Sequence, residues 1–204
     1  MSELLIIGCG GHGKVILDMA KKKSKWTTIQ FLDDYHIGEL INGIKVIGSI
    51  DMINSIDNYD YIIAVGDNKT RESIFNIAKN SNNTLVTIID SSAIISDTVV
   101  IGKGTVVMPN SVISTNSIVN ECCIINTGSI IEHDTNIGGF SHVSPGSVIC
   151  GNTKIGKSVW LGANSTVING VCVSSDIIVG AGSTVISNLR VKGTYVGSPV
   201  KKVK

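Results

Sequence analysis

The sequence contains few aromatic residues and few prolines, and it has no long apolar run. Phe, Trp and Tyr together make up 4% of the 204 residues, and only 3 residues are proline. The hydrophobic residues, 43% of the chain, are therefore mostly aliphatic, and we expect a core of Ile, Val and Ala. No segment reaches the roughly 18 consecutive apolar residues of a membrane-spanning helix, so we expect no membrane insertion.

The chain also lacks a charge excess and a cysteine pattern. Its formal net charge is +1, and the densest basic cluster, at 201–204, is typical of a solvated end, so we expect no nucleic-acid partner. The cysteines are odd in number and form no C-x-x-C pair, which indicates reduced thiols that serve as small packing residues: Cys9, Cys122, Cys123, Cys150 and Cys172. The first eight residues read as a buried strand rather than a secretory signal, and we expect a cytoplasmic location.

Residues 1–88 alternate between strand-like and helix-like patterns. We expect strands at 4–8, 28–32, 61–66 and 85–89, and helices at 14–23 and 69–79. Because strands that alternate with helices are typical of a parallel sheet, this part of the chain is predicted to form a small Rossmann-like α/β domain.

From Ile89 onward the pattern changes to a strict period of six. Every sixth residue from Ile89 to Val185 is Ile, Leu or Val, and the fifth position of each unit is mostly small or β-branched. A hexapeptide period predicts a parallel β-helix, in which three units make one triangular coil and residues eighteen apart stack. The large aliphatic residue points inward, and Gly and Asn at the corners supply backbone with positive φ. We therefore assign residues 89–204 to a β-helix with a short tail.

The whole chain resembles bacterial sugar acetyltransferases of the hexapeptide-repeat superfamily, of the nucleotide-amino-sugar N-acetyltransferase and sialic acid O-acetyltransferase type. The resemblance rests on the glycine loop 8–13, the segments 31–34 and 64–68, the Asn-Thr pair at 126–127, Ile-Glu-His-Asp at 131–134, Phe-Ser-His-Val at 140–143, and the ending 196–201. It implies that the β-helix is left-handed, although parallel crossover connections are usually right-handed. It also implies acetyl-CoA as the cosubstrate and glycan biosynthesis as the setting.

Gly8, Gly10 and Gly13 form G-x-G-x-x-G between a strand and a helix, and Asp33 and Asp34 follow about twenty residues later. This pattern is typical of dinucleotide-binding domains, but the β-helix leaves no conventional substrate domain for hydride transfer. The same chemistry suits the diphosphate and ribose of a UDP- or dTDP-linked sugar. The resemblance assigns this nucleotide to Gly10, Gly11, His12, Asp33, Asp34 and Gly66; the alternative for His12 is capping of the helix.

Acetyl transfer to an amine requires a general base and donors for the developing oxyanion. The resemblance places the base at His133 and the acid that orients it at Asp134, where relatives often have Glu. Gly151 lies eighteen residues after His133. We therefore expect it to stack one coil away, with exposed backbone whose N–H meets the thioester carbonyl.

The remaining site residues also come from the resemblance. His142 corresponds to a contact of acetyl-CoA, and Ala163 and Ala181 correspond to positions whose backbone meets the pantetheine arm. Asn126 either reaches the acceptor sugar or stacks in a polar ladder. Coenzyme A in similar proteins lies between neighbouring β-helices, which implies a homotrimer; threefold packing would also cover the flat faces of the prism.

Other functions remain open at this point. The acceptor could be sialic acid, with O-acetylation and the same base. A metal-dependent hydratase on the same prism would need three histidines, but only His133 and His142 lie in the repeat region, so we expect no metal. A non-catalytic nucleotide-binding protein would be insensitive to loss of His133. Cys150, next to Gly151, is interpreted as a packing residue because direct attack needs no acyl-enzyme.

Overall fold

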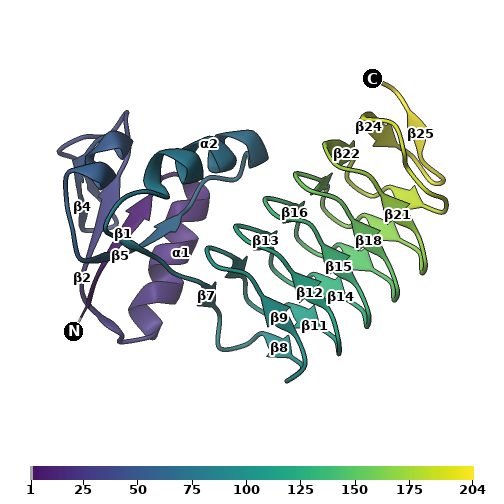
Figure 1. The fold of residues 1–204 in the computed structure, drawn as a ribbon, viewed down its shortest axis with the longest axis horizontal. Helices are drawn as coiled ribbons and strands as arrows, with labels where there is room; N and C mark the ends of the chain where they lie inside the picture. The colour runs from purple at the N-terminus through teal and green to yellow at the C-terminus, as the bar shows by residue number, and fades with distance from the viewer. Residues whose placement is uncertain (1) are drawn as a thin grey trace. The chain divides into compact units, whose positions relative to one another are not determined.

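The computed structural model describes residues 2–204 and contains two compact units, one up to Ile88 and the other from Ile89 to Lys204. Figure 1 shows the first as a sheet with helices and the second as a stack of coils. Among the described residues, no helix is long and apolar enough to cross a membrane.

The first unit is built on a six-stranded sheet with the order β3-β4-β2-β1-β5-β6. Neighbouring strands run parallel, except for the antiparallel β3–β4 pair. The strands are β1 (Ser2–Ile7), β2 (Trp26–Leu32), β3 (Leu40–Ile41), β4 (Ile44–Gly48), β5 (Tyr59–Ile63) and β6 (Thr84–Leu85). The helices are α1 (Gly11–Lys22), α2 (Asn68–Ala78) and the short 3₁₀ helix η1 (Ile50–Asn54).

The Rossmann-like prediction is confirmed, and three details differ from it. Helix α1 begins at Gly11, three residues before the apolar pattern starts, because the glycine loop turns directly into the helix. The region between β2 and β5 holds β3, β4 and η1, whose patterns are too short to predict. The strand expected at 85–89 is two strands, since β6 pairs with β5 whereas β7 (Ile88–Ile89) joins the second unit's sheet.

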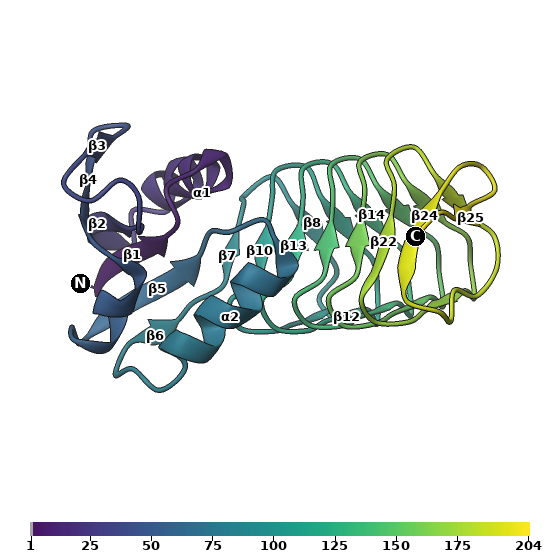
Figure 2. The ribbon, with the colours of Figure 1, turned by 90° about the horizontal axis from the view of Figure 1, so that it is seen from above.

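The second unit is a parallel β-helix of three sheets (Figure 2). Strands eighteen residues apart pair in register, as in Ile113 with Ile131 and Ile131 with Ile149. One sheet contains β7, β10 (Val106–Val107), β13 (Ile124–Ile125), β16 (His142–Val143), β19 (Trp160–Leu161), β22 (Ile177–Val179), β24 (Gly193–Val196) and the antiparallel β25 (Lys201–Lys202). The second contains β8 (Ile94–Ile95), β11 (Val112–Ile113), β14 (Ile130–Ile131), β17 (Val148–Ile149), β20 (Thr166–Val167) and β23 (Thr184–Val185). The third contains β9 (Val100–Ile101), β12 (Ile118–Val119), β15 (Asn136–Ile137), β18 (Lys154–Ile155) and β21 (Cys172–Val173). This is the left-handed β-helix architecture expected above.

The core of the β-helix consists of the aliphatic residues that recur every six positions. All of them, from Ile89 to Val185, are buried or pack against the buried cluster. The small residues at the fifth position also have a polar function that the sequence did not reveal. Buried hydroxyls such as Ser117 Oγ and Ser141 Oγ donate to the carbonyl fifteen residues later, at 2.9 Å in both cases. These bonds satisfy carbonyls at the corners, which would otherwise be costly to bury.

Between Gly104 and Gly182, one residue at each corner has a left-handed backbone, again every six positions. Most are Gly or Asn, for example Asn116 (φ 59°) and Gly128 (φ 64°), as predicted. Asp134 (φ 56°) occupies the same position in its coil. Asp tolerates this conformation better than most residues, so the corner geometry is compatible with a carboxylate here.

Candidate active site

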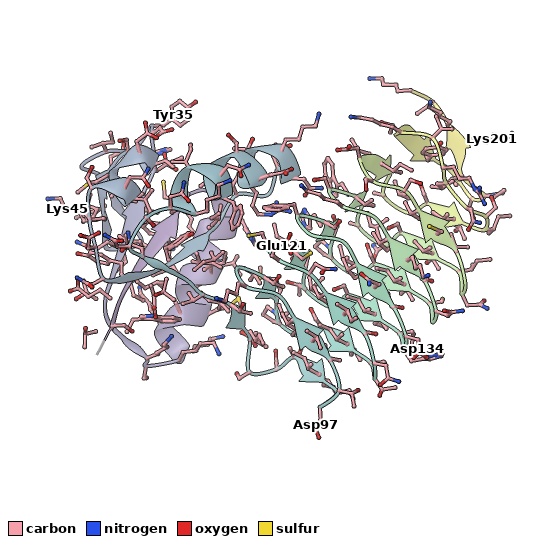
Figure 3. The ribbon with its side chains drawn as sticks, viewed as in Figure 1. Tyr35, Lys45, Asp97, Glu121, Asp134 and Lys201 are labelled. Atoms are coloured by element: carbon pink, nitrogen blue, oxygen red, sulfur yellow. The ribbon has the colours of Figure 1, made fainter. Side chains whose placement is uncertain are left out.

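His133 and Asp134 form a hydrogen-bonded pair at the corner between β14 and β15. The distance from His133 Nδ1 to Asp134 Oδ2 is 2.8 Å, so the shorter acid still reaches the ring. Both side chains are about half exposed, at 57% and 52%, and Asp134 lies at the edge of the coils (Figure 3). When Nδ1 donates to the carboxylate, Nε2 carries the lone pair that can accept a proton.

Asn116, which the sequence analysis missed, holds the other oxygen of the same carboxylate. Its Nδ2 donates to Asp134 Oδ1 at 3.3 Å from one coil away. The hydrogen bonds from His133 and from Asn116 lower the pKa of Asp134, so this group stays ionised near neutral pH. The signal was present in the sequence, since Asn116 precedes Asp134 by eighteen residues.

Gly151 lies under the imidazole of His133. A Cβ atom added to Gly151 would be 2.6 Å from both Cε1 and Nε2 of the ring. The expected exposure of this backbone is wrong, because the ring covers Gly151 and the residue is buried. Among residues 2–204, the Gly151 N–H has no hydrogen-bond partner. An imidazole nitrogen that can accept a proton and an available backbone donor are therefore adjacent.

His142 lies on the outer surface of β16 within a second polar group. Its Nε2 is 3.0 Å from Asn126 Nδ2, and its ring stacks against Trp160 with centroids 6.4 Å apart. The Trp160 indole is fixed in turn by a 2.9 Å hydrogen bond from Nε1 to Ser144 Oγ. The side chain of Asn126 therefore has a partner, His142, on the neighbouring strand β16. Trp160 is a further residue of this group that the sequence analysis did not identify.

Ala163 and Ala181 lie on neighbouring coils of one edge. They follow β19 and β22, and the N–H of Gly182 donates to the Ala163 carbonyl at 2.8 Å. Asn126 follows β13 and lies on this same edge, whereas His133 follows β14 and lies on the next edge of the prism. A single β-helix therefore does not bring the two groups of site residues together.

The glycine loop of the first unit is tightly packed at one point and open at another. Gly8 has a left-handed φ of 101°, and a Cβ on Gly13 would collide with the Gly8 carbonyl oxygen. By contrast, Gly10 and Gly11 have nothing within 4 Å of an added Cβ. The open backbone is at the start of α1, where orphan N–H groups and the helix dipole favour an anion.

Asp33, Asp34 and Gly66 follow the carboxyl ends of β2 and β5, on either side of β1, at the sheet edge where such folds bind nucleotides. Asp33 accepts hydrogen bonds from the backbone N–H of Cys9 at 3.1 Å and of Tyr35 at 3.0 Å. Burial alone would raise the pKa of Asp33, but these bonds and that of His36 outweigh it and lower the pKa to about 2.

Asp34 and Gly66 are both exposed, and each accepts one hydrogen bond. Asp34 is exposed and accepts from the Ile50 N–H at 2.9 Å. Gly66 is exposed, and its carbonyl accepts a 3.0 Å hydrogen bond from Arg71.

His12 lies in the first turn of α1, partly buried, near the positive charge of Arg71. Its Nε2 atom is buried and has no hydrogen-bond partner in the described part of the chain. Burial and the charge of Arg71 lower the pKa of His12 to about 4, so the ring is neutral near pH 7. Arg71 itself is 1% exposed and donates to the carbonyls of Val65 and Gly66 and to Asn68. Nothing in the local pattern of α2 distinguishes this arginine from a solvated one, which is why the sequence analysis missed it.

Comparison with known proteins gives consistent matches. Residues 3–78 match the family described as the PglD N-terminal domain. A stretch of 112 residues, 53% of this chain, is 31% identical to the UDP-N-acetylbacillosamine N-acetyltransferase of Bacillus subtilis (strain 168). The match spans about half of that relative's length, at 52%.

Two solved structures match over nearly their full lengths. The acetyltransferase domain of PglB from Neisseria gonorrhoeae FA1090 is 33% identical, with a TM-score of 0.96 and complete coverage of both chains. That domain has also been solved in complex with acetyl coenzyme A. Perosamine N-acetyltransferase from Caulobacter crescentus, solved as a His-to-Asn variant with CoA and GDP-perosamine, is 30% identical, with a TM-score of 0.94. That match covers 100% of this chain and 98% of the other.

Proposed function

This chain belongs to the hexapeptide-repeat sugar N-acetyltransferases, and from that premise we propose that it acetylates the amino group of a nucleotide-linked sugar with acetyl-CoA. The observation that carries the proposal is the His133–Asp134 pair lying across Gly151. The full-length similarity to a domain that binds acetyl coenzyme A, and to an enzyme that binds CoA and GDP-perosamine, supports it.

In the proposed reaction His133 is the general base. Its Nε2 takes a proton from the sugar amine as the nitrogen attacks the thioester carbon. The N–H of Gly151, which has no hydrogen-bond partner among residues 2–204, is the proposed donor to the oxyanion. The C–S bond then breaks, and the CoA thiolate takes the proton from His133, giving the amide and free CoA. Asp134 orients the imidazole and stabilises its protonated form.

The first unit, up to residue 88, is the proposed site of the nucleotide. The open backbone of Gly10 and Gly11 faces the diphosphate, and Asp33 and Asp34 accept the ribose hydroxyls. Gly66 lines the same edge. His12 is neutral, so in this proposal it contacts a phosphate by hydrogen bonding rather than by ion pairing. The proposed acceptor is a UDP- or dTDP-linked 4-amino-dideoxy sugar.

Acetyl-CoA is proposed to lie along the edge that carries Ala163 and Ala181, with His142 as a further contact. Because His133 lies on the next edge of the same prism, we propose that a homotrimer completes the site by placing one subunit's edge against its neighbour's. The five cysteines are all free thiols, which fits a reducing compartment, and we propose a cytoplasmic location in glycan biosynthesis.

The test is release of free CoA thiol from acetyl-CoA by the purified protein. The acceptors are UDP- and dTDP-linked 4-amino-4,6-dideoxy sugars, GDP-perosamine, and free or activated sialic acid. Turnover with an amino sugar is expected, and it should be lost in His133→Ala and strongly reduced in Asp134→Asn.

Asp176→Asn is the matched control for Asp134→Asn, because Asp176 has the same left-handed corner backbone (φ 59°) and should leave turnover unchanged. Turnover with sialic acid alone would replace the acceptor in the proposal and make the reaction O-acetylation. Full activity of His133→Ala would refute the assignment of the base.

A further inference from the structure

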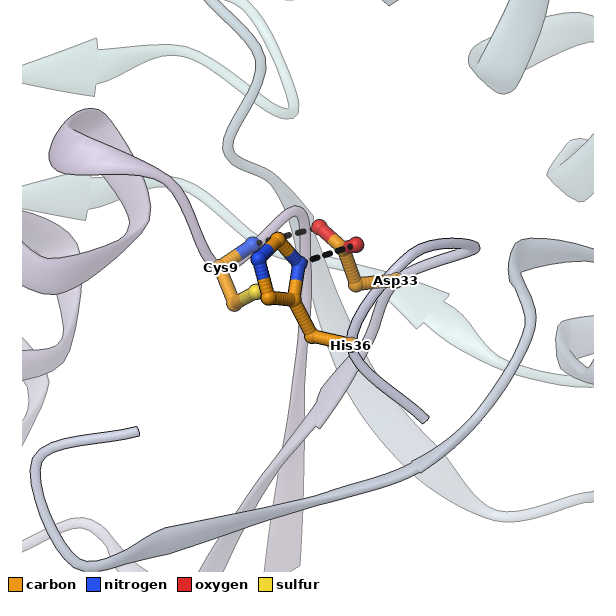
Figure 4. Close-up of side chains that lie close together, drawn as sticks. All are labelled: Cys9, Asp33 and His36. Carbon is orange, nitrogen blue, oxygen red and sulfur yellow. Dashed lines mark hydrogen bonds and ion pairs between the residues drawn. The ribbon is translucent and has the colours of Figure 1, made fainter. Parts of the chain in front are cut away.

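Three potential metal ligands meet in the first unit, where β1 and β2 end. Cys9 follows β1, and Asp33 and His36 follow β2. One ligand atom from each, a thiol sulfur, a carboxylate oxygen and an imidazole nitrogen, lies within 4.8 Å of the other two (Figure 4). Cys9 is buried, and the other two side chains are 15% and 44% exposed, so the cluster opens to solvent on the His36 side.

The backbone and the side chains already hold this cluster in place. Asp33 Oδ2 accepts from the Cys9 N–H at 3.1 Å, and Oδ1 is 3.0 Å from His36 Nδ1. Zinc binds sulfur at about 2.3 Å and nitrogen or oxygen at about 2.0–2.2 Å. A tetrahedral site therefore separates its ligand atoms by about 3.3–3.8 Å. The ligand atoms of Cys9, Asp33 and His36 lie within 4.8 Å of one another, so none has to move by more than about 1 Å to reach these distances.

The donor set selects the kind of cation. A thiolate and an imidazole favour zinc and similar borderline-soft ions, whereas magnesium and calcium prefer sites made of oxygen alone. Glu39 acts electrostatically on both Cys9 and His36 and adds negative charge, while Lys14 is a nearby positive charge that acts on His36.

We propose that Cys9, Asp33 and His36 bind a divalent cation of the zinc class with three protein ligands and one open position. On binding, the Cys9 thiol loses its proton to solvent, and the imidazole and the carboxylate donate lone pairs. Water or an oxygen of a bound ligand occupies the fourth position. This site lies in the first unit and shares no residue with the proposed acetyl-transfer group around His133.

One consequence rests on the proposed function. Asp33 is one of the carboxylates proposed to accept the ribose hydroxyls, so the cation and the nucleotide sugar use the same group. Zinc is then expected to raise the KM for the nucleotide sugar, and removal of the metal by a chelator is expected to restore it.

The direct test is titration of the metal-free full chain with Co²⁺, with detection of the thiolate-to-cobalt charge-transfer band. One equivalent should produce the band in the wild type and in Cys172→Ala, which removes an exposed thiol elsewhere. The band should disappear in Cys9→Ala. In His36→Gln, which removes the imidazole ligand from a partly exposed position, at least a tenfold higher Co²⁺ concentration should be needed.

A missing band in the wild type, or a band unaffected by both Cys9→Ala and His36→Gln, would overturn the proposal. The spectroscopic result does not depend on turnover. A normal band in a chain without acetyltransferase activity would therefore refute the proposed function and support the metal site. Acetyltransferase activity in a chain that gives no band would refute the metal site and support the proposed function.

Discussion

The substitution Gly151→Ala tests whether the position of the His133 imidazole determines the rate. The new methyl group would lie 2.6 Å from Cε1 and Nε2 of the ring, whereas an ordinary carbon contact needs about 3.5–4.0 Å. The ring must therefore move by about 1 Å. Gly151 does not have a left-handed φ, so alanine itself fits the backbone. The strain is relieved by the exposed side chain of His133 rather than by the fold.

A shift of this size stretches the 2.8 Å bond between His133 and Asp134 beyond hydrogen-bond range. Misplacement of a catalytic group by 1 Å can cost about 100-fold in rate. We therefore expect kcat/KM to fall about 100-fold, which corresponds to about 2.7 kcal/mol of transition-state stabilisation. The free energy of unfolding should change by less than about 0.5 kcal/mol, because the clash falls on an exposed side chain and not on the packed core.

The assay is steady-state thiol release by the wild type, Gly151→Ala, His133→Ala and the double variant, with urea unfolding of each. If alanine acts through the imidazole, it should have little further effect once His133 has been removed. The reasoning is refuted if Gly151→Ala keeps more than a third of the activity, or if the two losses multiply in the double variant.

Three further expectations concern neighbouring groups. Trp160→Ala should raise the KM for acetyl-CoA about 2- to 12-fold, because a stacked ring pair contributes about 0.5–1.5 kcal/mol and orients His142; an unchanged KM would contradict this. Asn116→Ala should lower kcat by about 2- to 12-fold, because it removes one hydrogen bond to Asp134 and such a bond contributes about 0.5–1.5 kcal/mol. A change in KM alone would show that Asn116 does not position the His133–Asp134 pair. The pKa of Asp33 is lowered to about 2, so its contribution to stability is present above about pH 4 and is lost as pH falls towards 2. Urea unfolding at pH 5 and pH 3 should therefore show a smaller loss of stability in Asp33→Asn than in the wild type.

The sequence predicted the features that depend on local repetition or on a local turn. The period of six identified the aliphatic residues that fill the β-helix from Ile89 to Val185, because each coil buries them in the same way. The glycine loop predicted a strand, a turn and a helix start in that order, because Gly8 and Gly13 are required by the backbone itself. The same spacing argument placed Gly151 beside His133, since residues eighteen apart stack.

Other predictions were wrong or incomplete where a distant partner decides the outcome. The backbone of Gly151 was expected to be exposed, but the imidazole one coil away covers it. The strand expected at 85–89 divides because β6 and β7 pair with different sheets. Asn116 was missed although its spacing was visible, because an asparagine at a corner is already explained by its positive φ.

The sequence by itself therefore determined the two architectures and the glycine loop, because each is encoded in neighbouring residues or in an exact period. Only the tertiary structure decided which side chains meet across strand ends and coils. It buried the Nε2 atom of His12 near the charge of Arg71, stacked Trp160 on His142, and placed His133 on a different edge from Ala163. It also gathered Cys9, Asp33 and His36 from two loops. Such contacts depend on the pairing of distant strands, and no local pattern of residues records them.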